Sequence, residues 1–159
     1  MKFKTREDIE ATLEQVFEAV SDFDSMERAA LRRGAEVTRT DTLTAPRQGM
    51  TWHAAFPYRN RIRTADMLLK TYEAPHQIEL FSKISGIEAT VEVELLSLSR
   101  NRTRMIMSID MRPRTIPARL LLQSMKLARA SLVKRYRKRV AKYAMSIENR
   151  YRTTAHPIR

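Results

Sequence analysis

Three histidines are the first residues to test for chemistry, because imidazole is a common metal ligand and general base in proteins. His53 falls within a strand pattern, His76 follows Pro75 in a turn, and His156 lies near the end of the chain. The sequence has no cysteine, and no Asp or Glu stands at ligand spacing from His53. It also lacks a glycine-rich phosphate loop and a Gly-x-Ser-x-Gly elbow. We therefore predict no metal site and no cofactor, and we assign no catalytic residue.

Asp66 is a second candidate, because it shares the strand parity of Thr64 and Leu68 in a run from Arg59 to Tyr72. If that parity faces the interior, the carboxylate could pair with Arg129, or Arg129 could hold an anionic group of a ligand. The simpler interpretation is that Asp66 faces water and that Arg129 extends past the rim of the core. The same run contains an alternating basic row, which we interpret as a solvated strand face: Arg59, Arg61 and Arg63.

The element that organises the chain is a long helix predicted from Pro117 to about Tyr151. Pro117 suits the first turn of a helix, and Thr115 can cap it. No Gly or Pro occurs between Pro117 and Pro157. Apolar residues recur at the helical period, at Leu121, Met125, Ala128, Leu132, Tyr136, Val140, Tyr143 and Ile147. We expect Leu132 and Tyr136 to be buried against the rest of the protein.

Positive charge is concentrated on this helix. The formal net charge of the chain is +12, and Glu148 is the only acid after Asp110. The predicted anion-binding surface consists of Lys134, Arg137, Lys138, Arg139 and Lys142. Such a surface attracts phospholipid, nucleic acid or an acidic protein. The alternative is a solvated face that only keeps the protein in solution.

The segments before the helix alternate apolar and polar residues, which is typical of strands with one buried face. A strand from Phe3 to Ile9 precedes two short helices, Glu10 to Val20 and Ser25 to Arg33. Six more strands are predicted at Ala35 to Thr40, Gly49 to Phe56, Arg59 to Tyr72, Gln77 to Lys83, Ile87 to Leu95 and Met105 to Met111. A slip of parity near Leu96 predicts a bulge. The fold class is α+β, a curved antiparallel sheet of about seven strands around the C-terminal helix.

The opening segments resemble a known family. Glu7 to Phe17 is similar to the strand-then-helix start of the START/Bet-v-1-like superfamily, also called SRPBCC, although Thr12 stands where proline is common. Asp22 to Glu27 resembles its loop into the second helix, with Met26 where an aromatic is frequent. The resemblance implies one helix-grip domain over residues 1–152 and a flexible tail at 153–159. It also implies a cavity between sheet and helix, because known members bind hydrophobic ligands there and some cyclise or hydrolyse them.

We expect this cavity to bind a hydrophobic small molecule, such as a lipid or a polyketide-like compound. Its predicted walls are Trp52, Phe56, Asp66, Leu68, Met105, Met107, Met125, Arg129, Leu132 and Tyr136. The methionines suit a pocket for varied apolar ligands, because their side chains are flexible. The alternatives are a cyclase- or hydrolase-type enzyme on the same scaffold and a nucleic-acid binder that uses the basic helix.

Location and partners follow from the same composition. No apolar run of a signal peptide occurs at the N-terminus, and no stretch approaches the roughly 20 apolar residues of a membrane span. With no cysteine, these features favour the cytoplasm. An anionic membrane is the partner that best fits a carrier of apolar ligands with a basic helix. Nucleic acid fits less well, because Tyr136, Tyr143 and Tyr151 lie on or near the apolar stripe and are expected to pack inward.

Overall fold

The computed structural model describes residues 1–155, with side chains through Arg152. Its centre is one seven-stranded sheet in the order β1-β7-β6-β5-β4-β3-β2, in which all neighbouring strands are antiparallel. The strands are β1 (Lys2–Ile9), β2 (Glu36–Arg39), β3 (Thr51–Tyr58), β4 (Arg61–Glu73), β5 (Gln77–Ile84), β6 (Ile87–Ser99) and β7 (Arg102–Pro113). This architecture confirms the predicted α+β helix-grip fold. The register of β6 and β7 shifts between Ser97 and Ser99, close to the predicted bulge.

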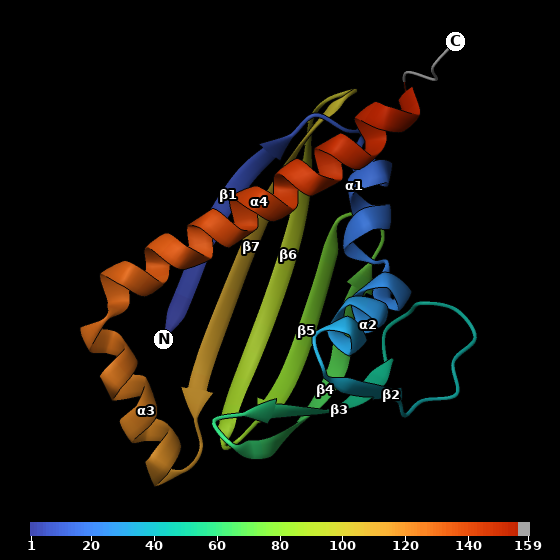
Figure 1. The fold of residues 1–159 in the computed structure, drawn as a ribbon. Helices are drawn as coiled ribbons and strands as arrows, with labels where there is room; N and C mark the ends of the chain where they lie inside the picture. The colour runs from blue at the N-terminus through green and yellow to red at the C-terminus, as the bar shows by residue number, and fades with distance from the viewer. Residues whose placement is uncertain (156–159) are drawn as a thin grey trace.

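The hydrophobic core fills one end of the sheet, where β1 ends and β7 begins. α1 (Leu13–Val20) starts with a capping box, in which the Thr12 and Gln15 side chains each accept from the backbone N–H of the other residue. α2 (Phe23–Arg32) follows, and both helices lie on the same side of the sheet as the C-terminal helix (Figure 1). The cluster of buried side chains includes Ile9, Val16, Phe17, Leu69, Leu95, Met105, Val140 and Ile147. These side chains close this end of the sheet, and Trp52 at the margin of the cluster also lines a pocket under α2.

The terminal helix is interrupted, so the prediction of one continuous helix is wrong. α3 (Ile116–Leu127) and α4 (Arg129–Ala155) meet at Ala128, where φ is −103° and ψ is 18°. The chain turns there, and α3 runs down beside the open end of the sheet (Figure 1). Neither proline nor glycine causes the turn. The buried residues of α3 are Ala118 and Leu122, and no large apolar side chain near Ala128 is buried to hold the two helices straight.

The end of α4 bears on the predicted domain boundary. Its backbone is helical through Ala155, beyond the predicted end of the domain at residue 152. The rest of the predicted flexible tail, residues 156–159, lies outside the described residues.

Gly86, in the hairpin between β5 and β6, positions α3. Its φ is +77°, and a Cβ at this position would lie 2.5 Å from Oγ1 of Thr115, the residue that caps α3. We therefore expect Gly86→Ala to displace Thr115, to loosen α3 and to lower the free energy of unfolding by about 1 kcal/mol or more. Urea unfolding and hydrogen exchange of the α3 amides measure the two effects.

Gly34→Ala is the matched control for this substitution. Gly34 also has a positive φ, +91°, but no atom lies within 4 Å of the position that its Cβ would take, so this variant reports backbone strain alone. Equal destabilisation of the two variants, with unchanged exchange in α3, would show that the contact with Thr115 does not matter.

Candidate functional site

An apolar pocket lies at the open end of the sheet, under α3. It has a volume of about 280 Å³ and lies between the β3–β4 hairpin, the β5–β6 hairpin and α3. We name it the α3 pocket. Its lining residues are Phe56, Tyr58, Arg59, Arg63, Ile84, Ser85, Ile87 and Leu121.

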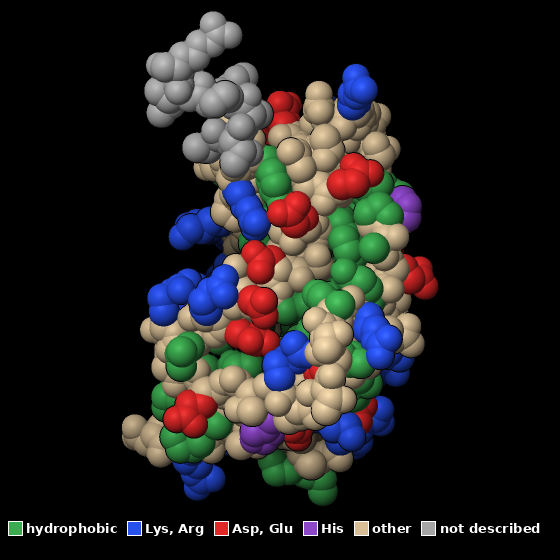
Figure 2. Space-filling view, turned by 90° about the vertical axis from the view of Figure 1, so that its right-hand side faces the viewer, with side chains coloured by type: hydrophobic (Ala, Val, Ile, Leu, Met, Phe, Trp, Pro, Cys, Tyr) green, Lys and Arg blue, Asp and Glu red, His purple; other side chains and the backbone are tan. Residues whose placement is uncertain are grey.

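A second pocket, the α2 pocket, lies between α2 and the inner face of the sheet. It has a volume of about 160 Å³ and is lined by Phe23, Met26, Glu27, Ala30, Val37, Trp52, Met67 and Leu80. Trp52 is fixed in this wall, because its Nε1 donates to Oε1 of Glu27 at 2.7 Å and its ring lies 5.4 Å from that of Phe23. Figure 2 faces this side of the molecule and shows hydrophobic side chains at the surface among the charged ones.

Both pockets lie along one face of β3 and β4. Trp52 of the α2 pocket and Phe56 of the α3 pocket are four residues apart on β3, which corresponds to about 13 Å. Between them Ala54 pairs with Ala65 of β4, so these two strands place only small side chains between the pockets. Both alanines are buried, so the two pockets are separate in this structure. We name the two pockets and this alanine pair the inner groove.

Arg63 gives the inner groove a positive charge. It pairs with Phe56 across β3 and β4, and its Nε is buried with no hydrogen-bond partner among the described residues. The lining of the α3 pocket contains no Asp or Glu. Arg59, the other cation of this pocket, lies over the Tyr58 ring at 5.4 Å. A buried donor without a partner is unfavourable, and an anionic oxygen is its strongest complement.

Comparison with known proteins gives the fold. No protein-family model matches the chain, and no curated protein matches it in sequence. Among solved structures, the Zhui aromatase/cyclase from Streptomyces sp. R1128 aligns with a TM-score of 0.66 at 14% identity, over 99% of both chains. The chain has the helix-grip fold.

Two further structures support this assignment of the helix-grip fold. Ara h 8.0201 aligns with a TM-score of 0.59 at 9% identity, over 92% of this chain and 98% of its own. A START superfamily protein from Mycobacterium smegmatis aligns with a TM-score of 0.56 at 10% identity, over 84% of this chain and 95% of its own.

The helix-grip fold places the predicted ligand residues in different environments. Trp52 lines the α2 pocket and Phe56 the α3 pocket. Four others are half-buried and line neither of these pockets: Met107, Met125, Leu132 and Tyr136. Leu132 and Tyr136 are therefore less buried than expected. The Tyr136 hydroxyl donates to the Met107 carbonyl at 2.7 Å, and partial burial raises the pKa of Tyr136 to about 12.

Met105 lies in the core and not in the inner groove. Its side chain is 0% exposed, in the cluster that closes the far end of the sheet. A residue in this position contributes to stability and has no surface to offer a ligand.

The inward orientation considered for Asp66 is wrong. Asp66 lies on the outer face of β4, its side chain is 73% exposed, and its Oδ1 lies 2.7 Å from Nδ1 of His53. Leu68 shares this outer face and is exposed. Arg129 does not reach Asp66, because its guanidinium lies 5.4 Å from the Phe3 ring and donates to the Lys2 carbonyl.

Sequence reasoning missed Arg63 because β4 offers two alternating sets of side chains. The set with Asp66 and Leu68 faces water, and the set with Arg63, Ala65 and Met67 faces inward. Since Ala65 is buried and Leu69 is fully buried, the continuous apolar parity from Ala65 to Leu69 was the signal that could have placed Arg63 inside. Arg63 therefore does not belong to a solvated row.

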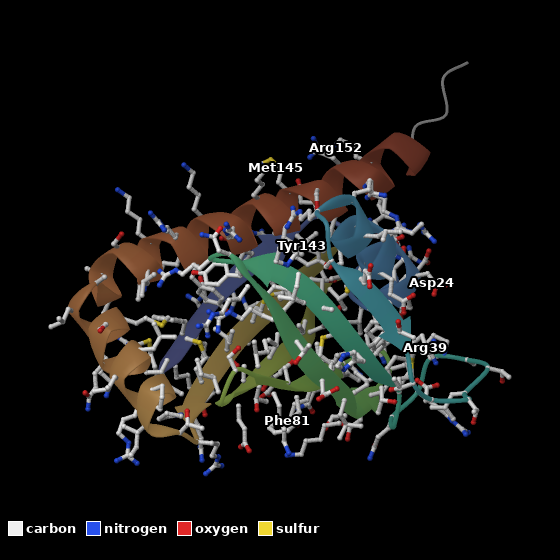
Figure 3. The ribbon with its side chains drawn as sticks, turned by 60° about the horizontal axis from the view of Figure 1, so that its bottom comes forward. Asp24, Arg39, Phe81, Tyr143, Met145 and Arg152 are labelled. Carbon is white, nitrogen blue, oxygen red and sulfur yellow. The ribbon has the colours of Figure 1, made fainter. Side chains whose placement is uncertain are left out.

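The predicted anion-binding residues of α4 are all exposed: Lys134, Arg137, Lys138, Arg139 and Lys142. In Figure 3, Met145 and Arg152 mark the side of α4 that faces away from the sheet. Lys134, Lys138 and Lys142 share that side, because they precede Met145 at steps of four and three. These residues are therefore accessible to an anionic partner, and the identity of that partner stays a prediction.

A groove of about 320 Å³ on the outer face of the sheet is a weaker candidate. Charged side chains of both signs line it, and some of them pair with one another, such as Arg114 with Glu88 at 2.8 Å. Because Arg114 and Glu88 form an ion pair with each other, neither is left without a partner to bind a ligand.

Proposed function

We propose that the inner groove binds a hydrophobic small molecule that carries an anionic group. The observation that supports this most is Arg63, whose buried Nε lacks a partner among the described residues, in a mostly apolar pocket with a second cation, Arg59, and no acid. The similarity of the fold to an aromatase/cyclase and to a START superfamily protein also supports the proposal, because such a scaffold suits small-molecule binding.

The groove also suggests the shape of the ligand. Small-molecule sites usually enclose about 300–1,000 Å³, and each pocket alone is smaller. A ligand that fills both would extend about 13 Å from Phe56 to Trp52. Its anionic end would lie against Arg63, and its apolar body would displace the side chains that now cover Ala54 and Ala65 to reach Trp52.

No observation favours the enzyme alternative. General acid–base catalysis needs a proton donor or acceptor with free access to the substrate. Glu27 is the only carboxylate that lines the two pockets, and it already accepts a hydrogen bond from Trp52. A lipid or polyketide-like ligand and a cytoplasmic location stay predictions.

Trp52 is the only tryptophan of the chain, so its fluorescence reports on the α2 pocket. We expect straight-chain carboxylic acids to change this fluorescence only above a threshold length, because short acids would bind at Arg63 without reaching Trp52. Native mass spectrometry of the purified protein would show whether such a molecule is retained.

Ala54→Leu and Ala55→Leu form a matched pair for this experiment. Ala54 lies between the pockets, whereas Ala55 is on the outer face of the same strand. Ala54→Leu should abolish the response of Trp52 to long acids, and Ala55→Leu should leave it unchanged. No response at any chain length, together with no retained molecule, would refute the proposed function.

A further inference from the structure

α3 exposes a row of large apolar side chains on the side opposite its buried face. Ile116 is 74% exposed, Leu120 is 58% exposed and Leu127 is 92% exposed. Their spacing of four and seven residues places them on one side of the helix, whereas the buried residues Ala118 and Leu122 lie on the other side. We name this row the α3 ridge. The exposed Gln123 and Ser124 lie between Leu120 and Leu127. Large apolar side chains exposed together on one side of a helix mark a candidate site of contact with another phase or molecule.

Basic residues lie on one flank of the α3 ridge, in the segment before α3 and along α4. From Arg112 to Lys142 the sequence has Lys or Arg at eleven positions and no acid: Arg112, Arg114, Arg119, Lys126, Arg129, Lys134, Arg135, Arg137, Lys138, Arg139 and Lys142. Arg119 and Lys126 are exposed on one flank of the ridge, and Lys134 and Lys138 are exposed on α4, in the second and third turns after Ala128. Leu127, the most exposed apolar residue of the ridge, lies at that turn.

The opposite charge is concentrated elsewhere. The segment of β1, α1 and α2 from Glu7 to Glu27 has eight acids and no Lys or Arg: Glu7, Asp8, Glu10, Glu14, Glu18, Asp22, Asp24 and Glu27. Asp8 pairs with Arg104, and Glu18 and Asp22 pair with Arg150, so part of this negative charge is neutralised. The α3–α4 corner is the more positive part of the molecule, and an anionic surface would attract it first.

We propose that the α3–α4 corner docks on an anionic phospholipid bilayer, with the α3 ridge inserted among the acyl chains and the cations among the head groups. A helix with apolar residues on one side and Lys and Arg beside them lies in the interface in this way. No helix among the described residues is long and apolar enough to span a membrane.

Other occupants fit the α3–α4 corner less well. A second copy of the chain would bring two dense positive surfaces together, which opposes association. Nucleic acid would engage the cations, but it would leave the α3 ridge in water. The aromatic residues that could stack on bases are turned inward, since Tyr136 and Tyr143 are half-buried and Tyr151 is buried.

Docking would also place the α3 pocket beside the bilayer. Leu120 belongs to the α3 ridge, and the adjacent Leu121 lines the α3 pocket. The pocket would then lie within about one helix diameter, roughly 10 Å, of the membrane surface.

Cosedimentation with vesicles of phosphatidylcholine, with and without phosphatidylserine, tests this inference at low and moderate salt. We expect binding only to the vesicles with phosphatidylserine, and weaker binding as salt rises. Leu120→Gln/Leu127→Gln should weaken binding about tenfold or more, and Lys134→Gln/Lys138→Gln should weaken it about tenfold to thirtyfold.

The chain supplies controls for both variants. Leu96 and Leu98 are exposed apolar residues of β6, and Arg32 and Arg33 are exposed cations at the end of α2. Leu96→Gln/Leu98→Gln and Arg32→Gln/Arg33→Gln should bind vesicles like the unchanged protein. Equal binding to both vesicle types, or equal losses in test and control variants, would overturn the inference.

Experiments without vesicles test the two other candidate partners of the α3–α4 corner, a second copy of the chain and nucleic acid. A dimer that dissociates only in Leu120→Gln/Leu127→Gln would assign the α3 ridge to self-association, which also overturns the inference. Binding to DNA that is lost in Lys134→Gln/Lys138→Gln but retained in Leu120→Gln/Leu127→Gln, without binding to vesicles, would assign the cations to nucleic acid. Because these variants leave the inner groove unchanged, the Trp52 fluorescence response tests the proposed function separately.

Discussion

Met105→Ala is expected to lower the free energy of unfolding by about 2–5 kcal/mol, the usual range for truncation of a buried methionine. Met105 pairs with Leu95 of β6 and Glu7 of β1, and its side chain has no exposed surface. The surrounding cluster comes from both sheet and helices, so it can collapse only partly into the space that the side chain leaves. Urea unfolding followed by circular dichroism measures the loss.

Met107→Ala is the matched control, because Met107 lies two residues further on the same face of β7 and is only half-buried. We expect a clearly smaller loss of stability from this variant. Since Met105 does not line the inner groove, Met105→Ala should leave the affinity for a ligand unchanged under conditions where the protein is folded. Equal losses in the two variants would contradict the placement of the core at this end of the sheet.

The strands could be predicted from the sequence because each has one solvent-exposed face and one buried face. Alternation from Ile87 to Leu95 and from Met105 to Met111 correctly located β6 and β7, although both strands extend further in the structure. The short connection between them correctly predicted their antiparallel pairing. The buried face of β4 was harder to predict, because both parities of that strand contain apolar residues. The uninterrupted apolar set Ala65, Met67 and Leu69 was the one sequence signal for the inner face, and the burial of Ala65 and Leu69 shows that this set is inside.

The turn at Ala128 could not be predicted in the same way. Helix propensity and apolar periodicity continue through this position without a Gly or Pro, so local sequence favours one helix. The interruption depends on long-range contacts, because α3 begins at the cap on Thr115 beside Gly86, whereas α4 packs across β1 and α1. The position of the α3 pocket and the exposure of the α3 ridge follow from this turn, and neither could be predicted from a straight helix.

Arg63→Gln is expected to reduce the affinity for a long carboxylic acid by about tenfold to one hundredfold. A hydrogen bond to a charged group contributes about 1.5–3 kcal/mol, and removal of the guanidinium leaves the carboxylate without its partner in an apolar pocket. The methyl ester of the same acid should bind both proteins equally, because it has no charge to lose. Titration of Trp52 fluorescence gives the four affinities.

Arg61→Gln is the control for Arg63→Gln, because Arg61 is exposed two residues earlier on β4 and does not line the α3 pocket. It removes the same charge, so an equal loss of affinity would indicate long-range attraction in place of contact. The free energy of unfolding of Arg63→Gln distinguishes a ligand-binding role of Arg63 from a structural role. The buried Nε of Arg63 has no partner among the described residues, so Arg63→Gln should not lower the free energy of unfolding of the empty protein.

The dependence of binding on pH gives an independent measurement of the same contact. An aliphatic carboxyl group has a pKa near 4.3, and arginine stays charged throughout the accessible range. Contact with Arg63 lowers the pKa of the bound carboxyl, so the preference of the unchanged protein for the acid over its ester should be complete well above pH 4.3. It should be lost over about one to two pH units below that value, as pH falls through the pKa of the bound acid. In Arg63→Gln the preference should be small at every pH, because the charge that distinguishes the two ligands has been removed. A preference that persists in Arg63→Gln would mean that Arg59, the other cation of the α3 pocket, holds the carboxylate instead.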